Sequence, residues 1–259
     1  GVWGTDPEGW AEFAEGHNEP LFVAVLDAAG VGRGTRLLDL GCGTGRALAL
    51  AHSRGAHAVG LDATVGLLDV AARRVPGVRL VPGELDALPF DGACFDAVTG
   101  INAFQFAADP QVALREAARV LAVGGRVVAS LFAEPERCES TAIHLAMSAL
   151  VPPAAPSSHA PYLLSEPGRL ESLLADAGLE VLDDGEVECT WAYDDVAGAV
   201  RGLLASAGGA RTVEVAGRAA TADAVRSAVA PFTAADGSIR MHNTFRWTSA
   251  VKAAERSTP

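Results

Sequence analysis

Between Arg36 and Phe132, short apolar runs alternate with amphipathic segments, and glycine, proline or acidic turns separate them. Such alternation is typical of parallel strands that are joined by crossover helices. The pattern therefore predicts five parallel strands with helices between them. The predicted strands are 36–40, 57–61, 78–82, 95–100 and 126–132, and the first two predicted helices are 46–54 and 64–74.

A third helix is predicted before the last of these strands. Asp109 and Pro110 form a favourable N-cap and first-turn pair, and Gly124 and Gly125 are expected to end the helix. Its apolar face is expected to hold Val112, Leu114, Ala117, Ala118 and Leu121.

After Phe132 the pattern changes. A short apolar helix is predicted over 141–150, and the proline-rich run 152–161 is interpreted as a loop. A further helix is expected to be capped by Ser165 and to end at Gly178.

Two later segments, 187–193 and 239–251, alternate polar and apolar residues. This is the period of half-exposed strands. We expect these strands to be antiparallel neighbours, with residues 194–236 as a helical insertion between them.

Composition and charge exclude several function classes. Twenty of the 259 residues are basic, all of them arginine except Lys252, so a phosphate-binding G-K-[ST] loop is absent and a Schiff-base lysine is disfavoured. The net charge of −12 disfavours nucleic acid as a partner. No apolar run is long enough to cross a bilayer, and the acidic beginning lacks a basic leader region. We therefore expect a soluble, cytoplasmic protein without a membrane partner; the pattern makes no prediction about oligomeric state.

Four cysteines are spread along the chain without a C-x-x-C pair. Neither a zinc cluster nor a short disulfide framework is predicted, and no metal is expected. The cysteines are interpreted as small buried hydrophobic residues.

The strongest chemical signal is Asp-Leu-Gly-Cys-Gly-Thr-Gly at 39–45, at the end of the first predicted strand and directly before a helix. Glycines permit a tight turn and let a ligand lie against bare main chain, beside the free N–H groups of the helix. A glycine-rich turn without a ligand is the alternative. Arg46 stands where a dinucleotide loop has its third glycine, and no Tyr-x-x-x-Lys pair occurs, so an NAD-dependent oxidoreductase is disfavoured.

Asp62 follows the second predicted strand, where nucleoside sites of α/β proteins place the acid that accepts hydrogen bonds from ribose hydroxyls. An N-cap for the helix that begins near Thr64 is the alternative interpretation.

Four segments resemble, in order and spacing, the motifs of class I S-adenosylmethionine-dependent methyltransferases, in particular the small-molecule branch related to the ubiquinone-biosynthesis C-methyltransferases. They are LLDLGCGTG at 37–45, VGLDAT at 59–64, GELDALPFDGACFDAV at 83–98 and LREAARVLAVGGRVV at 114–128. The resemblance covers roughly residues 20–132 well and the remainder in outline.

The resemblance implies a Rossmann-like, doubly wound α/β fold. Its sheet has seven strands, five parallel and two forming an antiparallel pair, with a helical lid. Three regions are expected: an N-terminal helical segment 1–35 that roofs the site, a cofactor-binding core 36–132, and a region 133–259 that completes the sheet. The lid insertions are expected at 133–164 and 194–236.

The resemblance also implies S-adenosylmethionine as the cofactor and assigns residues to it. The methionine end is expected to bind Asp39 and the loop Gly41, Cys42, Gly43, Thr44 and Gly45. Asp62 is expected to accept hydrogen bonds from both ribose hydroxyls, and Ala63 to pack on the adenine.

Glu84 replaces the aspartate that usually meets the adenine amino group in this family. The adenine contact is therefore left open among Glu84, Asp86 and the Leu85 N–H. Ile101 and Asn102 are expected beside the sulfonium, and Phe106 in the wall of the cleft.

The implied reaction is direct in-line methyl transfer to a small, apolar or aromatic metabolite. A base is needed only if the acceptor is a hydroxyl or an unactivated carbon. His17 and His144 are the preferred candidates because both lie in segments expected to roof the site, ahead of His159 and His242. The alternative is a cofactor-binding member of the fold that catalyses cyclisation or decarboxylation, or serves as a binding scaffold.

The acceptor pocket is expected to be lined by apolar residues outside the shared core. The N-terminal stretch, the helix 141–150 and the insertion 194–236 are the candidate segments. In the alternative reading, the same apolar residues only dock the lid onto the sheet. The residues in question are Trp3, Trp10, Phe13, Val196, Val200, Leu203, Leu204 and Phe232.

Overall fold

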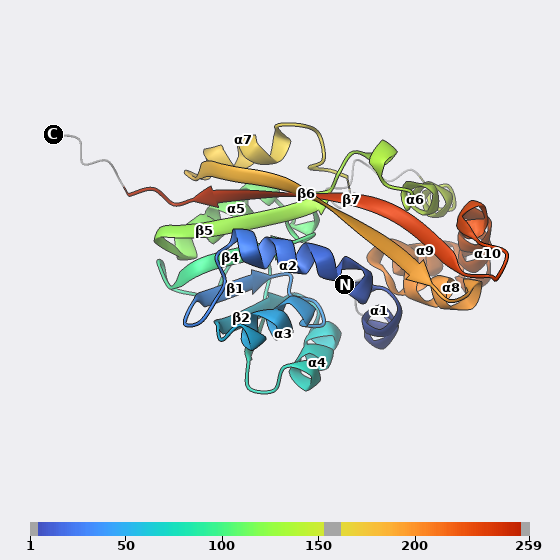
Figure 1. Ribbon diagram of the computed structural model, residues 1–259, viewed down its shortest axis with the longest axis horizontal. Helices are drawn as coiled ribbons and strands as arrows, with labels where there is room; N and C mark the ends of the chain where they lie inside the picture. Colours follow the sequence, from blue (N-terminus) through green and yellow to red (C-terminus); the bar gives the residue numbers. More distant parts are fainter. Residues whose placement is uncertain (1–4, 153–161, 255–259) are drawn as a thin grey trace.

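A mixed sheet of seven strands organises the protein in the computed structural model, which describes residues 5–152 and 162–254. The strand order is β3-β2-β1-β4-β5-β7-β6 (Figure 1). The strands are β1 Arg36–Leu40, β2 His57–Asp62, β3 Arg79–Pro82, β4 Phe95–Ile101, β5 Leu121–Phe132, β6 Glu180–Tyr193 and β7 Ile239–Val251. Strands β1 to β5 are parallel, and β7 is antiparallel to both β5 and β6. The predicted sheet is confirmed.

Helices cover both faces of the sheet. Apolar residues of α2 and α3 pack on one face, whereas those of α5 and α7 pack on the other. The helices before and within the parallel part are α1 Pro7–Phe13, η2 Glu15–Asn18, α2 Glu19–Ala28, α3 Arg46–Ser53, α4 Val65–Arg74, η3 Phe104–Phe106 and α5 Pro110–Val120. Those that follow are η4 Pro135–Arg137, α6 Thr141–Ser148, α7 Arg169–Asp176, α8 Val196–Ala205, α9 Ala207–Ala216, α10 Arg218–Val229 and η5 Ala230–Phe232.

The predicted end of the third helix was wrong. Helix α5 ends at Val120, and Leu121 begins β5, where it pairs with Phe95. The reason is that the carbonyls of Arg119 and Val120 accept hydrogen bonds from the N–H groups that precede β4, so the helical bonding stops there. The two glycines fall inside β5, next to an irregularity in its register with β4.

The predicted cap at Ser165 was also wrong. Helix α7 begins at Arg169 with Gly168 at its N-cap, and the Ser165 hydroxyl donates to the carbonyl of Phe132 over 2.7 Å. Ser165 therefore ties the segment before α7 to the end of β5. Most of the predicted loop 152–161 lies outside the described residues.

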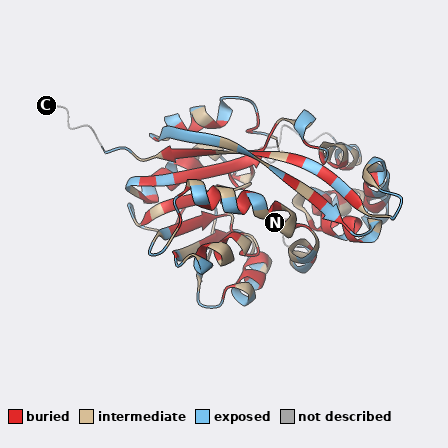
Figure 2. Ribbon diagram, viewed as in Figure 1, coloured by how far each residue is buried: buried red, intermediate tan, exposed pale blue. Residues whose placement is uncertain are grey.

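Strand β6 begins at Glu180, earlier than predicted, and forms one edge of the sheet. The first half of β6 is exposed and carries several acidic side chains (Figure 2). Charged side chains on an edge strand discourage pairing with another chain.

The β6–β7 pair extends past the carboxyl ends of the parallel strands. Phe132, the last residue of β5, pairs with Phe245, but β7 begins six residues earlier in sequence, at Ile239, which pairs with Tyr193 at the end of β6. Helices α8, α9 and α10 connect the two strands at this extended end, which we call the lid (Figure 1). Helix α1 contacts both α4 of the core and α8 of the lid.

Over 5–152 and 162–254, no helix combines the length and apolar character needed to span a membrane.

Candidate functional site

The glycine loop 41–45 lies at the carboxyl end of β1. Strand β1 is flanked by β2 on one side and β4 on the other, so this is the point where the strand order reverses. Ligands of open α/β sheets bind at such switch points.

All three glycines of the loop have positive φ angles, 67° at Gly41, 55° at Gly43 and 80° at Gly45. A Cβ atom at Gly41 would lie 2.8 Å from the Cβ of Ala103, and one at Gly45 would lie 3.0 Å from the Cβ of Ala71. At Gly43 the nearest such atom is Glu15 Oε1, at 3.8 Å. Packing therefore explains two of the glycines, whereas a Cβ at Gly43 would make only an ordinary contact with Glu15.

Asp39 is buried at the last-but-one position of β1, with 2% of its surface exposed. Its Oδ1 accepts a hydrogen bond from the Thr99 hydroxyl of β4 over 2.7 Å. Burial raises the pKa of Asp39 to about 7; the Thr99 bond opposes this shift, and the nearby charges of Asp62 and Glu15 add to it.

We expect this shift to make stability depend on pH. Folded Asp39 keeps its proton up to about pH 7, whereas the unfolded chain loses it near 3.8, so the unfolded state binds fewer protons in this window. The free energy of unfolding should therefore fall as pH rises from about 4 to about 7, by up to about 4 kcal/mol from this group.

Denaturant unfolding at pH 4.5 and pH 7.5 would measure this dependence, and Asp39→Asn should flatten it. Asp96→Asn is the matched control because Asp96 is paired with Arg36 and its pKa is lowered. Equal slopes for the two variants would contradict the assignment to Asp39.

Asp62 ends β2 and holds the glycine loop. Its Oδ2 accepts from the Gly43 N–H over 2.9 Å, and its Oδ1 from the Thr64 N–H over 2.8 Å. Burial raises its pKa, although the backbone hydrogen bonds counteract the shift. This geometry gives Asp62 a structural role; its predicted ribose contact stays a prediction.

Glu15 of η2 reaches the same loop from the N-terminal segment. It is 5% exposed, and its Oε2 accepts from the Thr44 hydroxyl and from Arg74 Nη1 of α4, each over 2.5 Å. Arg74 also donates to the Thr44 carbonyl over 2.9 Å. Sequence reasoning missed Glu15, because only the folded structure brings the N-terminal segment against the loop.

The other end of η2 contacts the extended part of β6. His17 Nε2 lies 2.7 Å from the Ala192 carbonyl, and Asn18 Oδ1 accepts from Trp191 Nε1 over 3.1 Å. The four residues of η2 therefore connect the glycine loop to the strand that carries the lid.

His17 has one buried nitrogen without a partner. A carbonyl only accepts, so Nε2 carries the hydrogen, and in the neutral ring Nδ1 keeps a free lone pair. Within the described residues Nδ1 is buried and has no hydrogen-bond partner. Burial lowers the pKa of His17, against the opposing effect of the Ala192 bond. The ring stacks edge-on against Tyr193, with ring centres 4.6 Å apart.

The other candidate histidines have different surroundings. His144 Nδ1 lies 3.2 Å from the Tyr162 hydroxyl, and burial lowers the His144 pKa to about 4. His242 is exposed on β7 and contacts Glu188 over 3.1 Å. His159 lies outside the described residues.

The adenine-side motif follows β3, next to the end of β2. The Gly83 N–H donates to the carbonyl of Asp62 over 3.1 Å, which brings the motif beside the loop. Glu84 is exposed, Leu85 and Asp86 are half-buried, and Ala63 is exposed. The choice among Glu84, Leu85 and Asp86 stays a prediction.

The segment after β4 contributes unpartnered polar atoms. Asn102 has a φ of 51°, its N–H donates to the Ser130 carbonyl, and its Oδ1 is buried without a partner in the described chain. Gln105, which the sequence did not single out, is fully buried, and neither of its amide atoms has a described partner. Ile101 and Phe106 are half-buried beside them.

Cys42 packs behind the loop against Leu48, Leu68 and Val75. Burial raises the pKa of its thiol well above the ordinary value. Cys42 is thus a buried hydrophobic residue rather than a nucleophile. The described part of the chain contains no group of three metal-ligating side chains.

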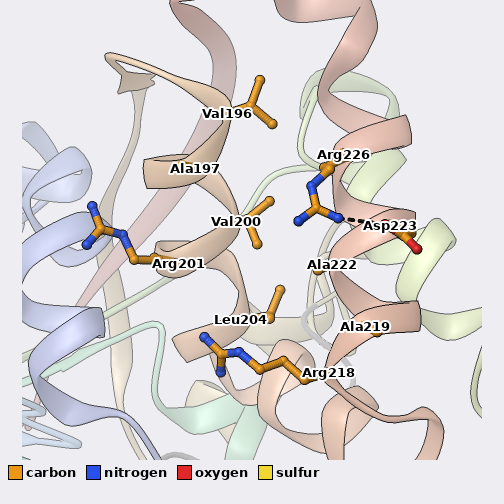
Figure 3. Close-up of a pocket in the computed structure, with 10 residues that line it drawn as sticks. All are labelled: Val196, Ala197, Val200, Arg201, Leu204, Arg218, Ala219, Ala222, Asp223 and Arg226. Carbon is orange, nitrogen blue, oxygen red and sulfur yellow. Dashed lines mark hydrogen bonds and ion pairs between the residues drawn. The ribbon is translucent and has the colours of Figure 1, made fainter.

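The lid contains a cavity of about 770 Å³ between α8 and α10 (Figure 3). Val196, Val200 and Leu204 line it from α8, and Arg218 and Arg226 lie along α10. None of its lining residues belongs to the glycine loop. Leu203 is buried in the lid core, and Phe232 is half-buried against that core.

The site fits the predicted cofactor in two respects. A side chain at Gly43 would occupy the space in front of the loop, where a ligand could otherwise lie against the main chain. The buried Asn102 Oδ1 lacks a hydrogen bond among the described residues. Both features are expected where a ligand with polar groups lies against the main chain.

Comparison with known proteins shows a partial match to one domain family and a shared fold. Residues 38–129 match the methyltransferase domain family. The structure is similar to that of the YcgJ protein of Bacillus subtilis, with a TM-score of 0.61, 23% identity, and coverage of 90% of this chain and 98% of that one. Residues 38–129 thus resemble a methyltransferase domain, and the chain shares the fold of this neighbour.

The names of the curated relatives specify a substrate. A demethylmenaquinone methyltransferase of Clavibacter sepedonicus is 38% identical over 123 residues, which are 46% of this chain and 50% of that protein. The match thus spans about half the length of the curated relative. The [4+2]-cyclase SpnF has the same fold, with a TM-score of 0.59, 21% identity, and coverage of 90% of this chain and 81% of that one.

Proposed function

We propose that the protein transfers the methyl group of S-adenosylmethionine to a small apolar or aromatic acceptor. The observation that carries this proposal is the glycine loop with its open side at Gly43, held by Asp62 at the switch point of the sheet. The match of residues 38–129 to a methyltransferase domain supports the reaction.

The residues proposed to hold the cofactor surround that loop. Asp39 and the loop backbone would bind its methionine end, Asp62 its ribose, and Ala63 its adenine, with Glu84, Leu85 or Asp86 at the adenine amino group. Ile101, Asn102 and Phe106 would lie near the reacting atoms. When bound, the cofactor supplies a methyl group on a positively charged sulfur.

In this proposal the protein contributes to the reaction by positioning the reacting atoms and by excluding water from the site. An in-line attack is accelerated mainly when the reacting atoms are held at near-contact distance in a preorganised site. The apolar lid and the N-terminal helices supply the covering, and the relative that acts on demethylmenaquinone, by its name, supports an aromatic acceptor of the quinol type.

His17 is the proposed base for an acceptor that must lose a proton. Its Nδ1 is unprotonated, buried and unpartnered in the described structure, whereas His144 Nδ1 contacts the Tyr162 hydroxyl. His17 also lies in η2, the segment that touches the glycine loop through Glu15.

Mass spectrometry tests the reaction itself. The protein is incubated with S-adenosylmethionine and with naphthoquinols and phenols as acceptors. A product heavier by one methyl group supports methyl transfer. A rearranged or decarboxylated product without an added methyl group would favour the alternative, a cyclase or decarboxylase of the same fold. The similarity to the cyclase SpnF does not decide between the two functions, because it shows the fold alone.

Activity should depend on the protonation of His17. We expect kcat/KM to rise with pH and to level off above a pKa lower than 6.5, because protonation of Nδ1 removes the base. His17→Gln should lower kcat/KM by roughly 10²- to 10⁴-fold and abolish this inflection. His52→Gln, an exposed change on α3, is the control; a wild-type profile in His17→Gln would exclude His17 as the base.

A further inference from the structure

We propose that Glu15 is a cofactor-binding residue whose Oε1 accepts a hydrogen bond from the α-ammonium group of S-adenosylmethionine. This inference rests on the function proposed above and adds a residue that the family motifs do not contain. It also makes the N-terminal segment part of the cofactor site.

The two oxygens of Glu15 have different surroundings. Oε2 is used by Thr44 and Arg74, which lie on the helix side of the loop. Oε1 takes no hydrogen bond from any described residue and lies 3.8 Å from where a Cβ atom of Gly43 would be. The carboxylate therefore presents one free oxygen to the open side of the glycine loop.

Charge at the loop favours a cationic ligand group. Three buried acidic side chains, Asp39, Asp62 and Glu15, surround the loop, and Arg74 is the cation that contacts one of them. Asp39 keeps its proton up to about pH 7, so the excess of negative charge comes from the other two. Asp39 and Asp62 accept hydrogen bonds from a hydroxyl and from backbone N–H groups, which carry no net charge. Buried carboxylates in excess over cations are costly, so an ammonium group placed among them is stabilised.

Glu15 is the member of this group that is placed to contact the ammonium. Both oxygens of Asp62 are engaged by backbone N–H groups, and Asp39 is buried beneath the loop against Thr99. Arg74 pairs with Glu15 through Oε2 alone, and the other nearby cation, Arg46, is paired with Glu19 of α2.

The position of Glu15 is fixed from both sides. Thr44 and Arg74 hold its carboxylate, while His17 and Asn18 hold η2 against β6. A carboxylate fixed in this way needs little reorganisation to receive a ligand, which is the usual basis of preorganised binding.

The test compares two ligands in wild type and Glu15→Gln by calorimetry. One ligand is S-adenosylhomocysteine, and the other is its analogue with hydrogen in place of the α-amino group. We expect Glu15→Gln to weaken binding of S-adenosylhomocysteine by roughly ten- to a hundredfold and to leave the affinity for the deaminated analogue unchanged, because only the first ligand offers the ammonium. Glu19→Gln is the matched control, since Glu19 is a carboxylate of the same segment that pairs with Arg46.

Other outcomes overturn the inference. Equal weakening of both ligands would mean that Glu15 only supports the loop, and unchanged or tighter binding of S-adenosylhomocysteine would mean that it makes no contact or blocks the site. If Glu15→Gln has a lower melting temperature, Glu15→Asp serves as a second variant, because it keeps the charge but withdraws it by one methylene. It must then show a smaller loss of affinity for S-adenosylhomocysteine and an unchanged affinity for the deaminated analogue. If neither ligand binds the wild type, the proposed function itself fails.

Discussion

Gly43→Ala is expected to lower the affinity for S-adenosylmethionine by more than about tenfold, which is about 1.4 kcal/mol. A methyl group at this position would stand in front of the loop, 3.8 Å from Glu15 Oε1, in the space that the cofactor occupies by our proposal. The positive φ of 55° adds backbone strain of roughly 1–2 kcal/mol, so the variant should also be less stable.

Gly34→Ala separates these two effects. Gly34 has a φ of 83°, and no atom lies within 4 Å of its would-be Cβ, so the variant carries similar strain without touching the loop. Calorimetric titration should show wild-type affinity for Gly34→Ala and weak binding for Gly43→Ala, with comparable losses in melting temperature. If the two variants bind S-adenosylmethionine with equal affinity, the interpretation that the cofactor lies against Gly43 is wrong.

Asp62→Ala is the second change with a large expected effect. It removes the acceptor of the Gly43 and Thr64 N–H groups and, by our proposal, the acceptor of the ribose hydroxyls. We expect cofactor binding to weaken by about 1–3 kcal/mol. Asp69→Ala, an exposed change on the neighbouring helix α4, should have no effect.

A ligand change distinguishes loop support from ribose binding. In the wild type, the 2′-deoxy analogue of S-adenosylhomocysteine should bind more weakly than S-adenosylhomocysteine. In Asp62→Ala the two ligands should bind equally, because the partner of the missing hydroxyl is already gone. A persisting difference in the variant would assign the ribose contact to another residue.

The parallel part of the fold could be predicted because local chemistry fixes it. The alternation of apolar runs and helical segments, together with the Asp109–Pro110 start of α5, specified strands and helices that the structure confirms. The prediction was wrong at Leu121, where tertiary hydrogen bonds to the segment before β4 ended the helix earlier than the glycines suggested.

Site residues could be predicted from the sequence only where a required backbone conformation or a family motif restricts the residue type. Positive φ angles require the glycines of the loop, so the sequence displays them. Glu15 and Gln105 carry no such mark, since only the folded structure brings Glu15 of η2 against the loop and buries Gln105 of η3. Single acidic and amide residues in helical segments are ordinary surface residues until the fold buries them.

The position of β7 in the sheet has a consequence for how the polypeptide matures. β7 is the last strand in sequence but lies between β5 and β6, so neither β6 nor the lid can be attached until residues 239–251 have been synthesised. Until then the nascent chain exposes the unpaired backbone of β5, a surface that binds chaperones or other strands. Pairing of β6 with the rest of the sheet is therefore expected to wait for residues 239–251, and a chain truncated before Ile239 is expected to be prone to aggregation.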